Sequence, residues 1–191
     1  NRAGEITYKE IGDLTIEVTV TTYTKANGTM VDRDSILIDW GDLETEFLQR
    51  SNGGGQIISN NVRKNIYKGI HVYPGRNTYK ISMTDPNRVG EIQNLNFPNS
   101  ENIRFHLFAI FTFTNQTFDG QNSSVILQQE PIDFACIGEP FIHIPAAYDE
   151  DDDSLVFELT VPYDGNGEQI EDYQYPNEII PTNNNFSFNT T

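Results

Sequence analysis

Five consecutive acids, Asp149-Glu150-Asp151-Asp152-Asp153, are the residues whose type and spacing most clearly suggest chemistry. Carboxylates at positions i, i+2 and i+4 can converge on one hard cation when a loop wraps around it, because Ca²⁺ takes oxygen ligands. Asp149, Asp151 and Asp153 have this spacing, so they are the candidate calcium ligands, and Glu150 and Asp152 are expected to face water. The alternative interpretation is an exposed, solvated acidic loop, which is what a run of like charges often forms.

The distribution of charge along the chain favours a bound cation. All 12 Lys and Arg residues lie at or before Arg104. If the chain is divided after Phe118, the first part has 13 acids and 12 bases, a net charge of −1, and the second has 15 acids and no base; together these give the formal charge of −16. A folded segment with that imbalance repels itself, so we expect a cation to neutralise part of it.

Two acid pairs in the first part invite a catalytic interpretation, namely Asp32 with Asp34 and Glu44 with Glu46. A catalytic carboxylate pair needs a cleft and two well-separated pKa values. A charged edge of a β-sheet is the simpler interpretation of both pairs. We therefore predict that the protein is not an enzyme.

Histidine and cysteine provide no metal-binding or catalytic pattern. His71, His106 and His143 are dispersed, without the spacing of a zinc-binding motif. Cys136 is the single cysteine, so an internal disulfide is impossible, and a small buried hydrophobe is the expected role.

The elements that must position these residues are predicted to be β-strands. The chain is rich in Tyr, Phe, Ile, Thr and Val and poor in Met, and no segment has a convincing helical pattern. Alternating or continuous apolar runs predict strands at 6–11, 14–23, 35–40, 65–73, 78–84, 104–114, 125–127, 141–144 and 155–161, with a short one possible at 186–188. Gly12-Asp13 is expected to form the turn of a hairpin. Many short strands between turns predict an all-β protein built of β-sandwiches.

Two motifs in the first part resemble the PKD domain, an immunoglobulin-like β-sandwich. They are Trp40-Gly41-Asp42 at the end of a strand and the stretch 71–83, which contains His71, Tyr73, Pro74-Gly75 and Tyr79. The resemblance implies that Trp40 fills the core, that Gly41-Asp42 makes a tight turn, that His71 is a structural hydrogen-bonder and that the tyrosine after Pro-Gly anchors a corner. The sequence departs from the family in having Leu43 at the second glycine position and a long Gly-rich insertion.

The second part resembles the cadherin-like sandwich, whose mark is Y-D-x-D-G-D-x-L before a strand. Tyr148, the three alternate aspartates and Leu155 match, and Asp152 replaces the glycine. Residues 186–191 resemble the start of the closing strands, so we expect an incomplete module with an open edge that a neighbour covers. In cadherin-like arrays the ion often lies at the domain junction, which makes Asp119 and Asn122 additional candidate ligands and Asp172 a weaker one.

Taken in order, six segments of the chain resemble modules of large secreted surface proteins of Bacteroidota. These proteins are gliding-motility-associated or PKD-containing and are exported by type IX secretion. The segments are 3–8, 39–42, 71–75, 85–88, 94–100 and 148–155. The resemblance implies a secreted, extracellular protein at the cell surface.

The sequence therefore predicts two tandem immunoglobulin-like β-sandwiches, PKD-like at 1–118 and cadherin-like at 119–191. The expected function is a non-enzymatic module of a surface adhesin or stalk, rigidified by Ca²⁺. The alternatives are a subunit or accessory of an extracellular filament or of a secretion or motility apparatus, and a carbohydrate-binding accessory module. Expected partners are neighbouring modules of the same chain, and secretion or motility machinery or a protein or glycan surface ligand. The acidity argues against binding to nucleic acid. The sequence has no apolar run of 18 residues, so we do not expect it to insert into a membrane.

Overall fold

The computed structural model describes residues 1–28, 32–59, 61–113, 120–131 and 142–175. In these residues all regular structure is β-strand, apart from one 3-10 turn, η2, at Ser100–Asn102. The prediction of an all-β chain is confirmed. No helix among these residues is long and apolar enough to cross a membrane.

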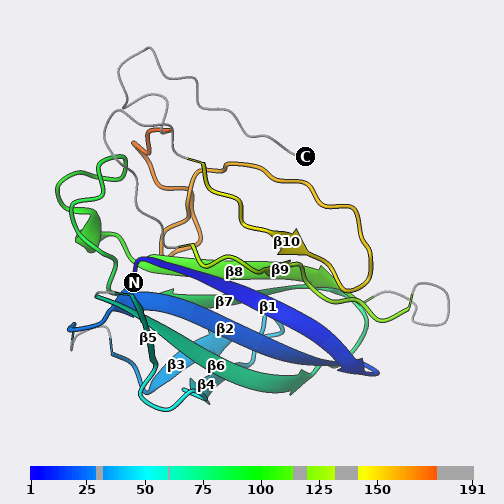
Figure 1. Cartoon of the computed structure of the whole chain (residues 1–191). Helices are drawn as coiled ribbons and strands as arrows, with labels where there is room; N and C mark the ends of the chain where they lie inside the picture. Colours follow the sequence, from blue (N-terminus) through cyan, green and yellow to red (C-terminus); the bar gives the residue numbers. More distant parts are fainter. Residues whose placement is uncertain (29–31, 60, 114–119, 132–141, 176–191) are drawn as a thin grey trace.

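The first sheet has four antiparallel strands in the order β1-β2-β6-β5 (Figure 1). They are β1 (Ala3–Gly12), β2 (Thr15–Lys25), β6 (Val62–Val72) and β5 (Gln56–Ser59). The predicted hairpin is confirmed, although its turn lies one residue later than expected. Gly12 pairs with Thr15, so Asp13 and Leu14 form the loop, and Leu14 takes a left-handed φ of 52°.

The second sheet also has four antiparallel strands, in the order β4-β3-β7-β8. They are β4 (Thr45–Gln49), β3 (Ser35–Asp39), β7 (Thr78–Asp85) and β8 (Phe105–Thr112). Along β7 the buried and exposed side chains alternate almost strictly, as expected for a strand with one face on a core and one face toward solvent.

One hydrophobic core takes inward-facing side chains from both sheets. Its members include Ile16, Val18 and Val20 of β2, Tyr67 of β6, Ile36 and Ile38 of β3, Ile81 and Met83 of β7, and Phe105 and Phe111 of β8. Trp40 lies in this core with 1 % of its surface exposed, so its predicted burial is confirmed. Tyr73 packs beside it, and its hydroxyl donates a hydrogen bond of 2.9 Å to the Trp40 carbonyl.

The roles expected of the residues around Trp40 are also confirmed. Gly41 has a left-handed φ of +82°, and a Cβ there would lie 2.5 Å from the Lys80 carbonyl oxygen, so the turn requires glycine. The His71 ring stacks on Trp40 at 4.6 Å between centroids, and its Nε2 lies 2.7 Å from the Asp42 carboxylate. The Tyr79 hydroxyl donates to the Gly75 carbonyl at 2.7 Å and fixes the corner that begins β7.

Beyond residue 119 the described residues contain two short strands, β9 (Ile126–Leu127) and β10 (Ala147–Tyr148), which pair with each other. The strand predicted at 155–161 is wrong, because this segment forms no ladder with any described residue. A strand needs a hydrogen-bonded neighbour, which an alternating sequence alone does not provide. Residues 142–144 are also without strand structure. Residue 141, the predicted boundary at 118, Cys136 and the segment 186–188 lie outside the described residues.

Among the described residues, the contacts of the second part with the first include the edge strand β1 and the outer face of β7 and β8. Ser123 forms an isolated antiparallel bridge with Lys9 on β1, the edge strand of the first sheet. Tyr163 packs edge-on against Phe108 of β8, with ring centroids 5.0 Å apart. Lys80 of β7 lies over the same two rings, with its Nζ 4.3 Å from the Phe108 centroid and 5.7 Å from that of Tyr163. The second part thus covers one sheet edge and part of one outer sheet face.

Candidate functional site

The acidic loop follows β10 directly and is carried by the pairing of β10 with β9 to the edge of the first sheet (Figure 1). The chain just before β9 is fixed to β1 by two hydrogen bonds. The Ser124 N–H donates to the Tyr8 carbonyl, and the Tyr8 N–H donates to the Ser124 hydroxyl, both at 2.9 Å. The loop therefore lies beside β1, although more than 130 residues of sequence separate them.

The loop wraps around the carboxylate of Asp149, which is only 8 % exposed. Its Oδ1 accepts the backbone N–H groups of Asp151 at 2.9 Å and Asp153 at 3.4 Å. Asp152 takes a left-handed φ of 61°, at the position where the resembled motif has glycine. The backbone thus forms a tight turn that is closed on the Asp149 carboxylate.

Two carboxylates from distant parts of the chain meet at the contact with β1. Asp151 Oδ2 accepts the N–H of Ser123 at 2.6 Å. The preceding amide in the chain, that of Asn122, donates to Glu10 Oε2 at 3.4 Å, and the Asn122 carbonyl accepts the Glu10 N–H at 3.1 Å. Because Asp151 and Glu10 accept the N–H groups of consecutive residues, their carboxylates approach the same short segment.

Glu10 is the site residue that the sequence interpretation missed. Its side chain is 1 % exposed, and it comes from β1 rather than from the acidic part of the chain. The sequence does contain a signal for it, because Glu10 is four residues after the core residue Ile6 and therefore lies on the same face of β1. A carboxylate at an inward-facing position of an alternating strand needs a special environment, because an unpaired buried charge is costly.

The negative charges of this site also act on Tyr8. The pKa of the Tyr8 hydroxyl is raised above its usual value, first by burial and then by the carboxylates of Asp149, Glu10, Asp151 and Asp153. All four acids therefore lie within electrostatic range of one partly buried ring. The hydrogen bonds thus place Asp149 and Asp151, two of the predicted ligands, near Glu10, a carboxylate that was not predicted.

Two lysines of the first part pair with acids of the second part, which the sequence-based argument for a bound cation did not anticipate. Lys9 on β1 forms an ion pair with Glu150, and Lys64 on β6 has its Nζ 3.2 Å from the Glu130 carboxylate. The hydrogen bond to Glu150, followed by its charge, raises the pKa of Lys9. Bases remote in sequence reach these acids because the second part lies on the first sheet. Glu150 therefore pairs with a lysine and does not simply face water.

The remaining predicted ligands are placed differently. Asp119 lies outside the described residues. Asn122 is at the site, where its backbone makes the two contacts with Glu10. Asp172 lines a polar cleft of about 550 Å³, together with Arg104 and Asp164.

The donor chemistry of the site fits a hard cation. The groups at hand are carboxylates, and Ca²⁺ takes six to eight oxygen ligands of this kind. In the described part of the chain, no group of three or more His, Cys, Asp or Glu side chains is arranged to hold a metal ion. A bound ion would therefore require the side chains to close around it.

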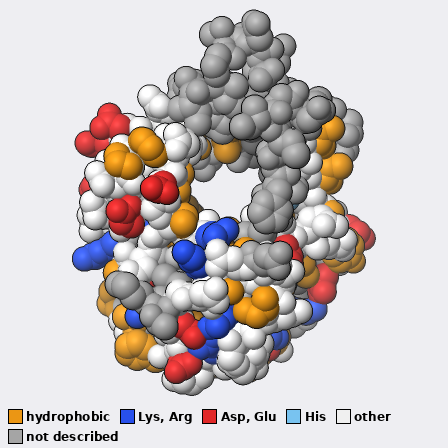
Figure 2. Space-filling model, turned by 60° about the vertical axis from the view of Figure 1, so that its left-hand side comes forward, with side chains coloured by type: hydrophobic (Ala, Val, Ile, Leu, Met, Phe, Trp, Pro, Cys, Tyr) orange, Lys and Arg blue, Asp and Glu red, His pale blue; other side chains and the backbone are white. Residues whose placement is uncertain are grey.

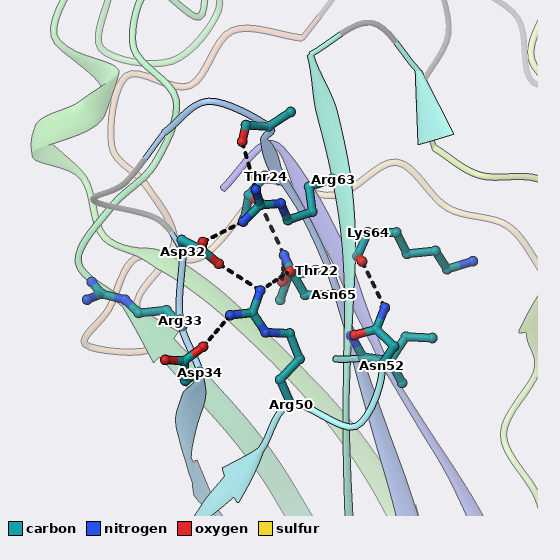
Figure 3. A network of polar contacts seen from close by, with 12 residues as sticks. Thr22, Thr24, Asp32, Arg33, Asp34, Arg50, Asn52, Arg63, Lys64 and Asn65 are labelled. Carbon is teal, nitrogen blue, oxygen red and sulfur yellow. Dashed lines mark hydrogen bonds and ion pairs between the residues drawn. The ribbon is translucent and has the colours of Figure 1, made fainter. Parts of the chain in front are cut away.

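Asp32 and Asp34, the other acids considered from the sequence, belong to an ion-pair network (Figure 3). Arg50, whose side chain is 3 % exposed, donates to Asp32 at 2.7 Å and to Asp34 at 2.6 Å. Arg63 lies 2.5 Å from the other Asp32 oxygen, and it is the main cause of the lowered pKa of Asp32, ahead of Arg50. The buried Asn65 accepts a further bond from Arg50 at 3.0 Å. These contacts give both acids a structural role.

Comparison of the chain with protein-family models, with curated proteins and with solved structures gives no match. The function therefore has to be inferred from the site itself. What the described groups offer chemically is a set of oxygen ligands at the contact between the two parts of the chain.

Proposed function

We propose that this chain is a non-enzymatic module of a secreted bacterial cell-surface adhesin or stalk protein, and that Ca²⁺ at the acidic loop fixes the second part of the chain to the first. One observation carries the calcium proposal. Glu10 of β1 and Asp151 of the acidic loop accept the N–H groups of consecutive residues, beside the nearly buried Asp149.

The physical reason is the cost of bringing like charges together. Glu10 and Asp149 are 1 % and 8 % exposed, so water screens them poorly. Lys9 forms an ion pair with Glu150. Among the described residues, no hydrogen bond joins its exposed ammonium to the carboxylate of Glu10 or of Asp149. A divalent cation between the carboxylates would convert their repulsion into attraction and would restrict movement between the two parts.

The immunoglobulin-like architecture belongs to the same proposal. When the eight strands of the first part are lettered A, B, C, C′, D, E, F and G in chain order, the two sheets become A-B-E-D and C′-C-F-G. This is the strand order of immunoglobulin-like sandwiches, and the Tyr79 corner at the start of strand F is another of their marks. For a cadherin-like second part, the support is the loop conformation, with Asp152 at the glycine position.

The test of the calcium proposal is thermal unfolding in Ca²⁺ and in a chelator, for the wild type and for Asp151→Asn. Ligand at a hundredfold excess over Kd stabilises by about 2.7 kcal/mol, which corresponds to an increase in Tm of about 5–10 °C for a chain of this length. We expect this increase in the wild type and in the control Glu171→Gln, which removes an exposed charge elsewhere. We expect no increase in Asp151→Asn. The proposal is refuted if the Tm of the wild type is the same in Ca²⁺ and in the chelator.

A second candidate function is a subunit of an extracellular filament, and one observation favours it. Residues 155–157 expose apolar side chains on a segment without a strand neighbour in the described part of the chain. The carbohydrate-binding alternative has no such support from Trp40, which is buried and offers no face to a sugar.

A further inference from the structure

The segment 154–161 has no assigned strand, turn or helix, and it lacks the hydrogen bonds of a strand. In Figure 1 it runs back past β10 as one long trace. No backbone N–H or carbonyl of these eight residues is hydrogen-bonded to any described residue. A row of such groups is a template on which another extended chain can form a ladder.

The side chains of this segment are also only partly covered. Val156 is 89 % exposed, and its neighbours Leu155 and Phe157 are 37 % and 39 % exposed. Leu155, Phe157, Leu159 and Val161 recur at every second position and would therefore share one face of a strand. Ile142 and Ile144 expose 77 % and 68 % of their surface in the same part of the chain. Exposed apolar surface of this kind marks an interaction site.

The charge around the segment defines the chemistry of its partner. Five acids precede it, Glu158 lies within it, and no Lys or Arg occurs after Arg104. The residues 176–191 of the same chain carry one acid and no base, so they lack the complementary charge. A second copy of this chain would bring its own net charge of −16. A basic strand from a different protein is the complementary occupant.

We propose that residues 154–161 accept an extended segment of another protein chain, one that alternates apolar residues with Lys or Arg, as an added β-strand. The ladder between the two backbones supplies affinity, while the apolar positions and the acids select the partner. This inference shares with the proposed function only the assumption that the chain is a structural module, and it does not require calcium.

The test uses the whole 191-residue chain and a fluorescent synthetic peptide that alternates Val or Ile with Lys or Arg. Binding is measured by anisotropy, in chelator and in Ca²⁺, so that failure of the calcium site and failure of strand binding remain distinguishable. Two control peptides are the same sequence with Glu in place of the bases, and the same composition with two central prolines. We expect saturable binding of the basic peptide alone, with affinity decreasing as salt increases.

Two matched pairs of variants locate the binding site. Val156→Pro and Val156→Thr both alter the exposed side chain, but only proline removes the backbone N–H donor. We expect proline to weaken binding by about tenfold, which corresponds to about 1.4 kcal/mol, and threonine to weaken it less than about threefold. Glu158→Lys is expected to weaken binding about fivefold at low salt, through like-charge repulsion, and Glu171→Lys to leave it unchanged.

Hydrogen exchange provides an independent measurement on the same samples. We expect the amides of 154–161 to exchange fast in the free chain and to become protected when the peptide binds. Amides already protected without peptide would mean that the chain covers this segment itself, and the proposal would be overturned. It would also be overturned if the basic peptide does not bind, or if Val156→Pro binds it as well as Val156→Thr.

Discussion

Arg50 should be the most important charged residue for the stability of the first part, and Arg50→Met tests this. Its guanidinium contacts three acceptors at one end of the sheets, namely Asp32, Asp34 and Asn65 (Figure 3). These three acceptors differ strongly in exposure: Asn65 is 0 % exposed, and the side chains of Asp32 and Asp34 are 37 % and 97 % exposed. The cost of the substitution therefore comes unequally from the three contacts.

The magnitude follows from those exposures. Loss of the bond to Asn65 leaves a buried amide oxygen without its Arg50 donor, at a cost of about 1–3 kcal/mol. Loss of the bond to Asp32 costs about 0.5–1 kcal/mol, because Asp32 is partly solvated and keeps Arg63. The bond to Asp34 contributes about 0–0.5 kcal/mol, because Asp34 is almost fully in water. Methionine keeps the apolar stem, so we expect a total cost of about 2–4 kcal/mol and a decrease in Tm of roughly 4–16 °C.

The assay is urea and thermal unfolding followed by the fluorescence of Trp40, the single tryptophan, which is 1 % exposed in this core. The matched control is Asp34→Ala, expected to change the free energy of unfolding by less than about 0.5 kcal/mol. A second readout is pH. The pKa of Asp32 is lowered from 3.8 in the folded chain, so its stabilisation is present above that value and is lost as the pH falls through the lower, folded pKa. Arg50→Met should weaken this acid dependence. The reasoning is refuted if Arg50→Met unfolds like the wild type, or if Asp34→Ala costs as much.

Two further substitutions test local geometry. Tyr79→Phe keeps the packed ring but removes the donor to the Gly75 carbonyl, so urea denaturation should show a loss of about 1 kcal/mol; no loss would mean that the corner does not depend on this bond. Asp152→Gly should stabilise the chain by about 1 kcal/mol, measured as Tm in chelator, because its φ of 61° strains any residue with a Cβ. Destabilisation by glycine would mean that the Asp152 side chain has a role beyond its backbone conformation.

The first part was predictable from sequence because its features are local. Alternation of apolar and polar residues marks which face of a strand is buried, and it correctly indicated β2 and β7. Trp40, Gly41 and Tyr79 lie in short motifs that were sufficient to assign their roles, although Trp40 and Gly41 also contact His71 and Lys80, which are distant in sequence. The turn around the Asp149 carboxylate is also a local feature, because its hydrogen bonds join residues two and four positions apart.

The tertiary structure alone decided which distant residues meet. It brought Glu10 to the acidic loop, paired Lys9 with Glu150, and left residues 154–161 without a strand partner in the described part of the chain. None of these outcomes is encoded in a short window of sequence, because burial and charge pairing depend on which surfaces are packed together. The sequence determined most strands of the first part and the excess of negative charge. The packing of the second part on the edge strand β1 decided where that charge lies and which basic side chains reach it.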